Sequence, residues 1–436
     1  MVADKRSLLS RHKAVLPAWL ALYYDEPIEI VSGEGCRVID GDGREYLDFF
    51  AGILTNMLGY NVPEVREAVK KQLDTGVVHT STLYLIQAQI ELAEKIASLS
   101  GIPDARVFFT SSGTEANEAA LLLATQYRRS NQVLALRNSY HGRSFAGMGV
   151  TGNRGWSASS LTPLNVHYVH SGYRYRSPFA DLPDAEFTAA CVSDLRDVIT
   201  TMTAGDVACL IAEPIQGVGG FATPPDGFFA AFKEVLDEYG ILFVSDEVQT
   251  AWGRTGEHFW GIEAHGVLPD AMTFAKGLGN GMSIGGVVAR AEVMNCLSAN
   301  SISTFGGNPL VTAAANATLD YVLSHDLQAN AAKVGTALLE GLRDLQARHT
   351  FIGDVRGKGL MIGVELVVPG STTPDAAAAT RVMEETKARG LLVGKGGLFG
   401  NVLRVAPPLT LSAADAAEGL QLLGEAFAAA EQPAGR

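Results

Sequence analysis

Two charged residues stand at the ends of two apolar runs, thirty residues apart. The run Ile-Leu-Phe-Val-Ser precedes Asp246, and the run Ala-Met-Thr-Phe-Ala precedes Lys276. Each run is typical of a buried parallel strand, and open α/β sheets bind ligands at the carboxyl ends of such strands. The pattern therefore predicts a buried amine beside a buried carboxylate, an arrangement that is costly unless a ligand uses both groups.

Pyridoxal phosphate is a cofactor that would use both groups. Lys276 would form an imine with its aldehyde, and Asp246 would keep its ring nitrogen protonated. Each unit by which a pKa is raised needs about 1.4 kcal/mol. An anion about 3 Å away supplies up to about 5 kcal/mol at an effective dielectric of about 20, before desolvation is subtracted. That energy covers a few units, so the cationic ring could serve as an electron sink for a substrate carbanion.

Two nucleotide-binding interpretations compete with this one. The Asp246-Glu247 pair after an apolar strand resembles a Walker B motif, and Gly277-Leu-Gly-Asn-Gly281 resembles a dinucleotide loop. However, the sequence contains no GxxxxGK[ST] phosphate loop, and the glycine run lacks the full G-x-G-x-x-G spacing. Both interpretations are therefore disfavoured.

A second strand candidate runs into a turn of small polar residues. Phe-Phe-Thr-Ser is followed by Ser112, Gly113 and Thr114, and then by an amphipathic helix. Free N–H groups and the helix dipole at such a turn favour an anion such as a phosphate. A plain helix cap by Ser112 or Thr114 explains the same residues equally well.

Two further strands end in residues that could serve the same site. Tyr140 could stack on a heteroaromatic ring, and Arg143 could hold a substrate carboxylate as a bidentate fork. His141 is as well explained by a structural hydrogen bond, and we assign it no proton transfer. Glu213 either orients its neighbours or caps a loop, and we count it among the candidate cofactor-binding residues.

The elements around these residues predict an α/β fold. From about residue 105 apolar strands alternate with amphipathic helices, which implies a mostly parallel sheet covered on both faces. Residues 151–185 are expected to form a long surface excursion. The expected strands are 106–110, 132–136, 208–213, 241–245, 272–275 and 284–289, and the expected helices lie near 114–128, 226–239 and 309–324.

The remaining segments predict a second, smaller unit. Helices at 327–348, 375–389 and 412–429 flank short strands at 352–356, 360–366, 391–394 and 402–406. A hairpin around Asp-Gly-Asp-Gly within 37–48 is expected to complete this unit. We therefore divide the chain into an N-terminal arm and hairpin (1–65), which form part of the small domain, a large cofactor-binding domain (66–325) and a C-terminal small α+β domain (326–436).

Composition restricts partners and location. The net charge of −13 argues against nucleic acid and anionic membrane surfaces as partners. The four cysteines form no CxxC pair, so neither a metal site nor a disulfide framework is predicted. The first residues lack the apolar stretch of a signal peptide, and no run approaches the length of a membrane span. These features predict a cytoplasmic protein.

With these residues assembled, the sequence resembles the class III (ω-type) pyridoxal-phosphate aminotransferases over roughly 17–428, and within them the alanine–glyoxylate branch. The motifs that carry the family resemblance are Ser112-Gly-Thr-Glu-Ala-Asn-Glu118, Tyr140-His-Gly-Arg143, Glu213-Pro-Ile-Gln-Gly217, Asp246-Glu-Val-Gln249, Ala275-Lys-Gly277 and Thr304-Phe-Gly-Gly-Asn-Pro309. The resemblance implies fold type I, the aspartate aminotransferase-like fold, with a large sheet of about seven strands and a small α+β domain.

The same resemblance implies roles by position. Lys276 would be the Schiff-base lysine, and Asp246 the partner of the ring nitrogen. Other cofactor contacts would come from Tyr140 on the ring, Gln249 at the phenolic oxygen, Ser112, Gly113 and Thr114 at the phosphate, and Thr304 from the neighbouring subunit of a homodimer.

The substrate contacts follow from the resemblance as well. Arg404 would grip the α-carboxylate of the amino donor or the keto acid. Relatives that act on an ω-amine mask this arginine with a glutamate where this chain has Val218, and the ornithine enzymes place a tyrosine where Ile53 stands. These departures favour α-amino donors such as alanine. Arg143 matches a second carboxylate-binding arginine, which keeps a dicarboxylic or ω-carboxyl substrate open.

The expected activity is ping-pong transamination between an amino acid or amine and a keto acid such as pyruvate or glyoxylate. Lys276 would move the proton from Cα. A lyase acting on amino phosphates, a decarboxylase or a racemase on the same scaffold remains the alternative. A catalytically silent binding protein is disfavoured because Lys276, Asp246 and Gln249 are all present.

Overall fold

The computed structural model describes residues 7–431, and its largest element is a seven-stranded sheet. The strand order is β4-β10-β9-β8-β7-β5-β6. All neighbouring pairs are parallel except those of β10, which runs antiparallel to β4 and β9. The strands are β4 (Ala105–Thr110), β5 (Gln132–Leu136), β6 (Asn165–Val169), β7 (Cys209–Ala212), β8 (Leu242–Asp246), β9 (Ala271–Phe274) and β10 (Gly285–Arg290).

Helices cover both faces of this sheet, because its inner strands are apolar on both sides. Val133, Ile211 and Val244 pack against α5 (Gly113–Arg128). Residues of the opposite parity, such as Leu134, Leu210 and Phe243, pack with the phenylalanines of α7 (Asp184–Met202) and α8 (Phe228–Glu238). Strands buried on both faces leave only their ends open to ligands, which fixes where a site can form.

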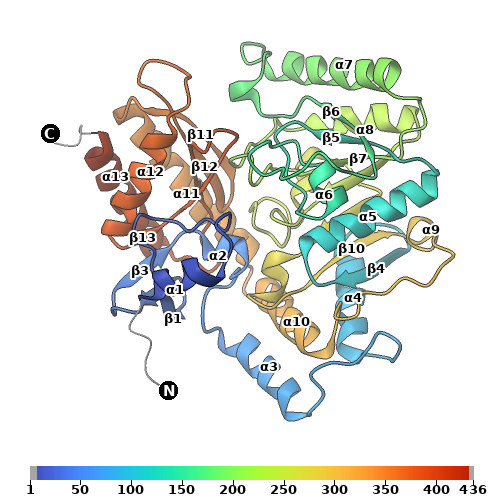
Figure 1. The fold of residues 1–436 in the computed structure, drawn as a ribbon, viewed down its shortest axis with the longest axis horizontal. Coiled ribbons are helices and arrows are strands. Elements are labelled where there is room, and N and C mark those ends of the chain that lie inside the picture. The colour runs from blue at the N-terminus through green and yellow to red at the C-terminus, as the bar shows by residue number, and fades with distance from the viewer. Residues whose placement is uncertain (1–6, 432–436) are drawn as a thin grey trace.

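Two smaller four-stranded sheets are built from the N-terminal and C-terminal parts of the chain, and they lie on one side of the molecule (Figure 1). The parallel pairing of Leu391 with Leu47 joins the two ends in the first of these sheets. That sheet contains β1 (Ile30–Glu34), β2 (Arg37–Asp40), β3 (Glu45–Asp48) and β13 (Leu391–Leu392), and the second contains β11 (Ile352–Lys358), β12 (Met361–Leu366), β15 (Val402–Val405) and β14 (Gly394–Gly396).

The other elements complete the two parts of the fold. Helices α11 (Leu327–Arg348), α12 (Ala376–Ala388) and α13 (Ala413–Glu431) pack on the small sheets, and α10 (Pro309–Ser324) packs against α3 (Pro63–Asp74) and α4 (Gln87–Leu99). The short helices are α1 (Leu8–Val15), α2 (Ala51–Leu54), α6 (Phe145–Gly149), α9 (Ala291–Met294) and the 3-10 turns η1 (Arg174–Arg176), η2 (Gly261–His265) and η3 (Lys276–Gly279). Within residues 7–431 no helix has the length and apolar character needed to cross a bilayer.

The predicted α/β fold with a large, mostly parallel sheet and a smaller α+β part is confirmed, including the hairpin at 37–48. Several elements were not predicted: the 151–185 excursion contains edge strand β6, and α7, β1 and the short helices α2, α6 and α9 were also missed. The single strand expected at 391–394 is two strands, β13 and β14, which belong to different sheets. The proposed domain limits at 65/66 and 325/326 stay a prediction.

Candidate active site

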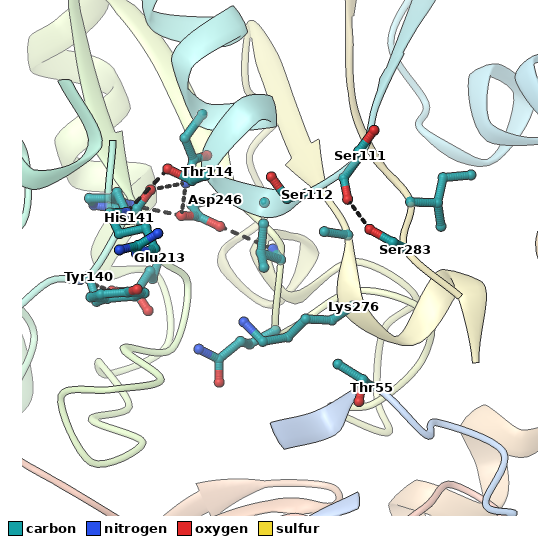
Figure 2. A pocket seen from close by; sticks show the side chains of 18 of the residues that line it. Thr55, Ser111, Ser112, Thr114, Tyr140, His141, Glu213, Asp246, Lys276 and Ser283 are labelled. Atoms are coloured by element: carbon teal, nitrogen blue, oxygen red, sulfur yellow. Dashed lines mark hydrogen bonds and ion pairs between the residues drawn. The ribbon is translucent and has the colours of Figure 1, made fainter. Parts of the chain in front are cut away.

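A cavity of about 440 Å³ lies at the carboxyl ends of the central strands (Figure 2). The loops that follow β4, β5, β7, β8 and β9 line it, as the strand topology predicts. It brings together nine of the predicted site residues: Ser112, Gly113, Thr114, Tyr140, Arg143, Glu213, Asp246, Gln249 and Lys276. Residues from five separate loops therefore meet in one place.

Asp246 is the most firmly held of these residues. Its Oδ2 accepts hydrogen bonds from Nδ1 of His141 and from Nδ2 of Asn117, each at 2.7 Å, and its Oδ1 accepts the N–H of Val248 at 3.1 Å. The side chain is 4% exposed, so these donors replace the water that would stabilise its charge. Nδ1 must carry a proton to donate, which makes His141 an orienting residue, as the structural interpretation of this histidine predicts.

Lys276 follows β9 and faces the same cavity (Figure 2). Burial lowers the pKa of its amine to about 8, the negative charge of Asp246 opposes that change, and Arg404 adds to it. The backbone of Lys276 has a φ of 45°, in the left-handed region that costs a side-chain-bearing residue about 1–3 kcal/mol. Such strain is characteristic of functional positions, and a buried amine with a lowered pKa can act as a nucleophile and a base.

The first turn of α5 forms an anion cradle at one end of the cavity. Ser112 caps the helix by accepting the N–H of Glu115 at 3.3 Å, so the cap interpretation also holds. The hydroxyl oxygen of Thr114 accepts the N–H groups of Arg143 and Ser144, each at 3.2 Å, and thereby fixes the neighbouring loop. The helix start leaves backbone N–H groups directed at the cavity, which suits a phosphate.

Glu213 joins two loops around the cavity. Its carboxylate accepts the N–H of Tyr140 and the N–H of Gly217, both at 2.8 Å, and burial raises its pKa to about 7. This is the orienting role that the sequence left open against simple loop capping. A Cβ on Gly217 would lie 2.3 Å from the amide of Gln249, so only glycine lets this loop approach that side chain.

These residues fit pyridoxal phosphate. The anion cradle lies at one end, a charged carboxylate lies deep in the cavity, and a reactive amine faces it. Oε1 of Gln249 is buried without a hydrogen-bond partner among residues 7–431, as expected of a group that awaits a ligand. Within the same residues no group of three His, Cys, Asp or Glu side chains could hold a metal ion.

Two predicted residues lie outside this cavity. Arg404, on β15, is buried over the ring of Phe50 at 4.8 Å and donates to the carbonyl oxygens of Lys395 (3.2 Å) and Gly217 (3.5 Å). It has no carboxylate partner among the described residues, so the chain leaves it unmasked. Thr304 is exposed and does not line the cavity of its own chain.

Several residues that line the cavity were given no role from the sequence. Asn117 bridges Asp246, the carbonyl oxygen of His141 and the hydroxyl of Thr273. A polar residue on the buried face of an otherwise alanine-rich helix was the available signal. Thr55, Ser111 and Ser283 also line the cavity but come from loops whose contacts the sequence does not encode locally; Ser283 donates to the carbonyl oxygen of Ser111.

Comparisons with known proteins agree with this geometry. The family pattern described as "Aminotransferase class-III" matches residues 22–427. An alanine–glyoxylate aminotransferase 2 homolog from Arabidopsis thaliana is 42% identical over 94% of this chain and 84% of its own length. A leucine/methionine racemase from Thermococcus litoralis is 36% identical over 98% and 96%. An amine transaminase from an uncultivated Pseudomonas species, solved with pyridoxal phosphate bound, superposes with a TM-score of 0.89 at 32% identity over 98% of each chain. The protein therefore belongs to the class III aminotransferases, enzymes that depend on pyridoxal phosphate.

Proposed function

We propose that the protein moves the amino group of an α-amino acid such as alanine to a 2-oxo acid such as pyruvate or glyoxylate. The single observation that supports this choice best is Arg404, a buried guanidinium near the cavity without a carboxylate partner among the described residues. A buried unpaired cation is costly, and a substrate α-carboxylate would relieve that cost through two parallel hydrogen bonds. The Arabidopsis relative, named for alanine and glyoxylate, supports the same substrates.

The residues divide the work as follows. When bound, pyridoxal phosphate supplies an aldehyde for the incoming amine and a cationic ring that accepts electrons. Asp246, held by His141 and Asn117, would present its carboxylate to the ring nitrogen. Ser112, Gly113 and Thr114 would hold the phosphate, Tyr140 would stack on the ring and Gln249 would reach the phenolic oxygen.

Lys276 moves the proton. Because burial lowers the pKa of its amine to about 8, a fraction of the amine is already uncharged near neutral pH. With cofactor and substrate bound, Nζ of Lys276, which lines the same cavity, would accept the proton from Cα and return it on the cofactor side. One cavity serves donor and acceptor, so the first oxo acid leaves before the second enters.

The test uses the holoenzyme and L-alanine. Without an oxo acid we expect one equivalent of pyruvate per site, and continuous turnover only after glyoxylate is added. Lys276→Ala should abolish turnover. Continuous consumption of alanine without an acceptor would contradict transamination.

The Thermococcus litoralis relative keeps racemisation as a second candidate. A racemase returns the proton to the opposite face of Cα and needs no oxo acid. Chiral chromatography of L-alanine incubated with the holoenzyme alone decides between the two: accumulation of D-alanine supports the racemase. Incubation of the holoenzyme with an amino phosphate or an amino acid, again without an acceptor, would reveal lyase activity as released phosphate and decarboxylase activity as released carbon dioxide.

We also propose a homodimer in which Thr304 reaches the partner's cofactor. Support comes from exposed apolar side chains beside this residue: Phe305 is 61% exposed, and Leu85 is 94% exposed in a neighbouring loop. His79 contacts Phe305 with ring centroids 4.8 Å apart, which joins the two segments. Light scattering tests the dimer, and Thr304→Ala should weaken cofactor binding. A cytoplasmic location stays a prediction from the sequence.

A further inference from the structure

The N-terminal arm, residues 17–24, contacts Arg143 directly and Arg404 through Phe50, the two arginines that could bind substrate carboxylates. Trp19 lies against Arg143, with the guanidinium carbon 5.7 Å from the ring centroid. Four residues later Tyr23 stacks on Phe50, with centroids 6.1 Å apart and planes 24° apart. Phe50 is in turn the ring under Arg404, at 4.8 Å. One short segment therefore connects the two guanidinium groups.

The Tyr23 end of the arm is anchored. The hydroxyl of Tyr23 accepts the N–H of Lys395 at 3.2 Å and donates to its carbonyl oxygen at 3.4 Å. That same carbonyl oxygen accepts Nε of Arg404 at 3.2 Å. Two residues further on, Asp25 donates its N–H to Glu384 at 2.7 Å. Trp19 is thus only four residues from Tyr23, which shares the carbonyl oxygen of Lys395 with Arg404.

At the other end, Arg143 lines the cavity with an uncommitted guanidinium. Its backbone N–H is used by Thr114, but its side chain makes no hydrogen bond or ion pair with residues 7–431. A ring over the guanidinium covers its face, whereas its N–H donors lie in its plane. Trp19 can therefore restrain Arg143 without occupying the donors that a carboxylate would use.

We propose that Trp19 is a positioning residue that holds Arg143 for the second carboxylate of a dicarboxylic amino or oxo acid. Binding of an α-carboxylate by Arg404 and of a distal carboxylate by Arg143 is what the family resemblance implies; the new element is the restraint that Trp19 places on Arg143. This inference rests on the proposed aminotransferase function and on Arg404 as the α-carboxylate site. An exposed cation–π contact contributes about a two- to fivefold factor in an equilibrium constant.

The test measures binding of unreactive acids to the holoenzyme by calorimetry, so that it does not depend on turnover. Glutarate, a five-carbon diacid, is compared with butyrate, which has one carboxylate. For the wild type we expect glutarate to bind at least tenfold more tightly. Trp19→Ala should weaken glutarate binding about two- to fivefold and leave butyrate within error, while Trp19→Phe should retain most of the glutarate affinity because a ring remains.

Two controls separate this role from a general loosening of the arm. Leu20→Ala changes an exposed neighbour, 46% exposed, that has no ring to place over a guanidinium, and should leave both affinities unchanged. In an Arg143→Ala background, Trp19→Ala should have no further effect on glutarate. Equal weakening of both acids in Trp19→Ala, or an undiminished effect in the Arg143→Ala background, would overturn the proposal.

A turnover readout distinguishes this proposal from the proposed function. Trp19→Ala should raise KM for 2-oxoglutarate with kcat nearly unchanged, and should not alter KM for pyruvate. If the wild type transfers no amino group to any oxo acid, the proposed function fails. If it does, but glutarate binds no better than butyrate, only the inference about Trp19 and Arg143 fails.

Discussion

The pKa of Lys276 can be measured without any substrate, and it follows directly from the burial of its amine. Burial lowers this pKa from 10.5 to about 8. At about pH 7.5 an amine of that pKa is about one quarter uncharged, compared with about one thousandth for an ordinary lysine. The reactive form is therefore enriched by about two orders of magnitude before any cofactor is bound.

Replacing Asp246 with asparagine tests the electrostatic part of this reasoning. The carboxylate of Asp246 stabilises the charged form of Lys276, and the substitution removes that charge while keeping the shape. The pKa of Lys276 should therefore fall below about 8 in the variant. If Asp246 carried no charge in the wild-type protein, the substitution would remove none, and the pKa of Lys276 would stay in place.

The assay is pH-dependent labelling of the cofactor-free protein with trinitrobenzenesulfonate, read peptide by peptide by mass spectrometry. The Lys276 peptide should reach half-maximal labelling rate near pH 8, with the other lysine peptides as internal references at higher pH. Asp246→Asn should shift that midpoint down. A wild-type midpoint near 10, or an upward shift in the variant, would refute the account of the buried amine.

Two further substitutions test the supports of the site. Gly142→Ala places a Cβ 2.3 Å from the hydroxyl oxygen of Thr114 and imposes a side chain at a φ of 127°. We therefore expect the cofactor dissociation constant, measured by equilibrium dialysis, to rise at least tenfold. An unchanged constant would mean that this turn does not shape the phosphate cradle. The buried carboxylate of Glu247 accepts the N–H groups of Gly261 (2.9 Å) and Ile262 (2.8 Å), and Glu247→Gln replaces one of its two oxygens with an amide NH₂. One of these donors should lose its acceptor, and the free energy of unfolding in urea should drop by about 1–3 kcal/mol; an unaltered urea midpoint would contradict this.

Much of the fold could be predicted because its signals are local. Strands such as Leu242–Asp246 are buried on both faces and therefore appear as uninterrupted apolar runs. The edge strand β6 was missed because an edge needs no such run: Asn165 is exposed and Val166, His167 and Tyr168 are only half-buried. Separating β13 from β14 requires knowing which partner strand each one meets, and that information is not local.

The site residues likewise fall into those that local signals predict and those that they do not. Lys276 and Asp246 could be found because each follows directly on a predicted strand, and strand topology brings such ends together. Asn117 could not be assigned its bond to Asp246, because that contact depends on how α5 lies across the sheet. The contact between Trp19 and Arg143 spans more than a hundred residues and joins the arm to the large sheet's loops, so only the folded chain reveals it.

The central claim is that the amine at position 276 carries the cofactor. The most direct measurement is reduction of the holoenzyme with borohydride, followed by proteolysis and mass spectrometry of the peptides. We expect a pyridoxyl phosphate label on the peptide that contains Lys276 and on no other, with loss of this label in Lys276→Ala. A label on a different lysine, or none in an enzyme that turns over, would contradict it.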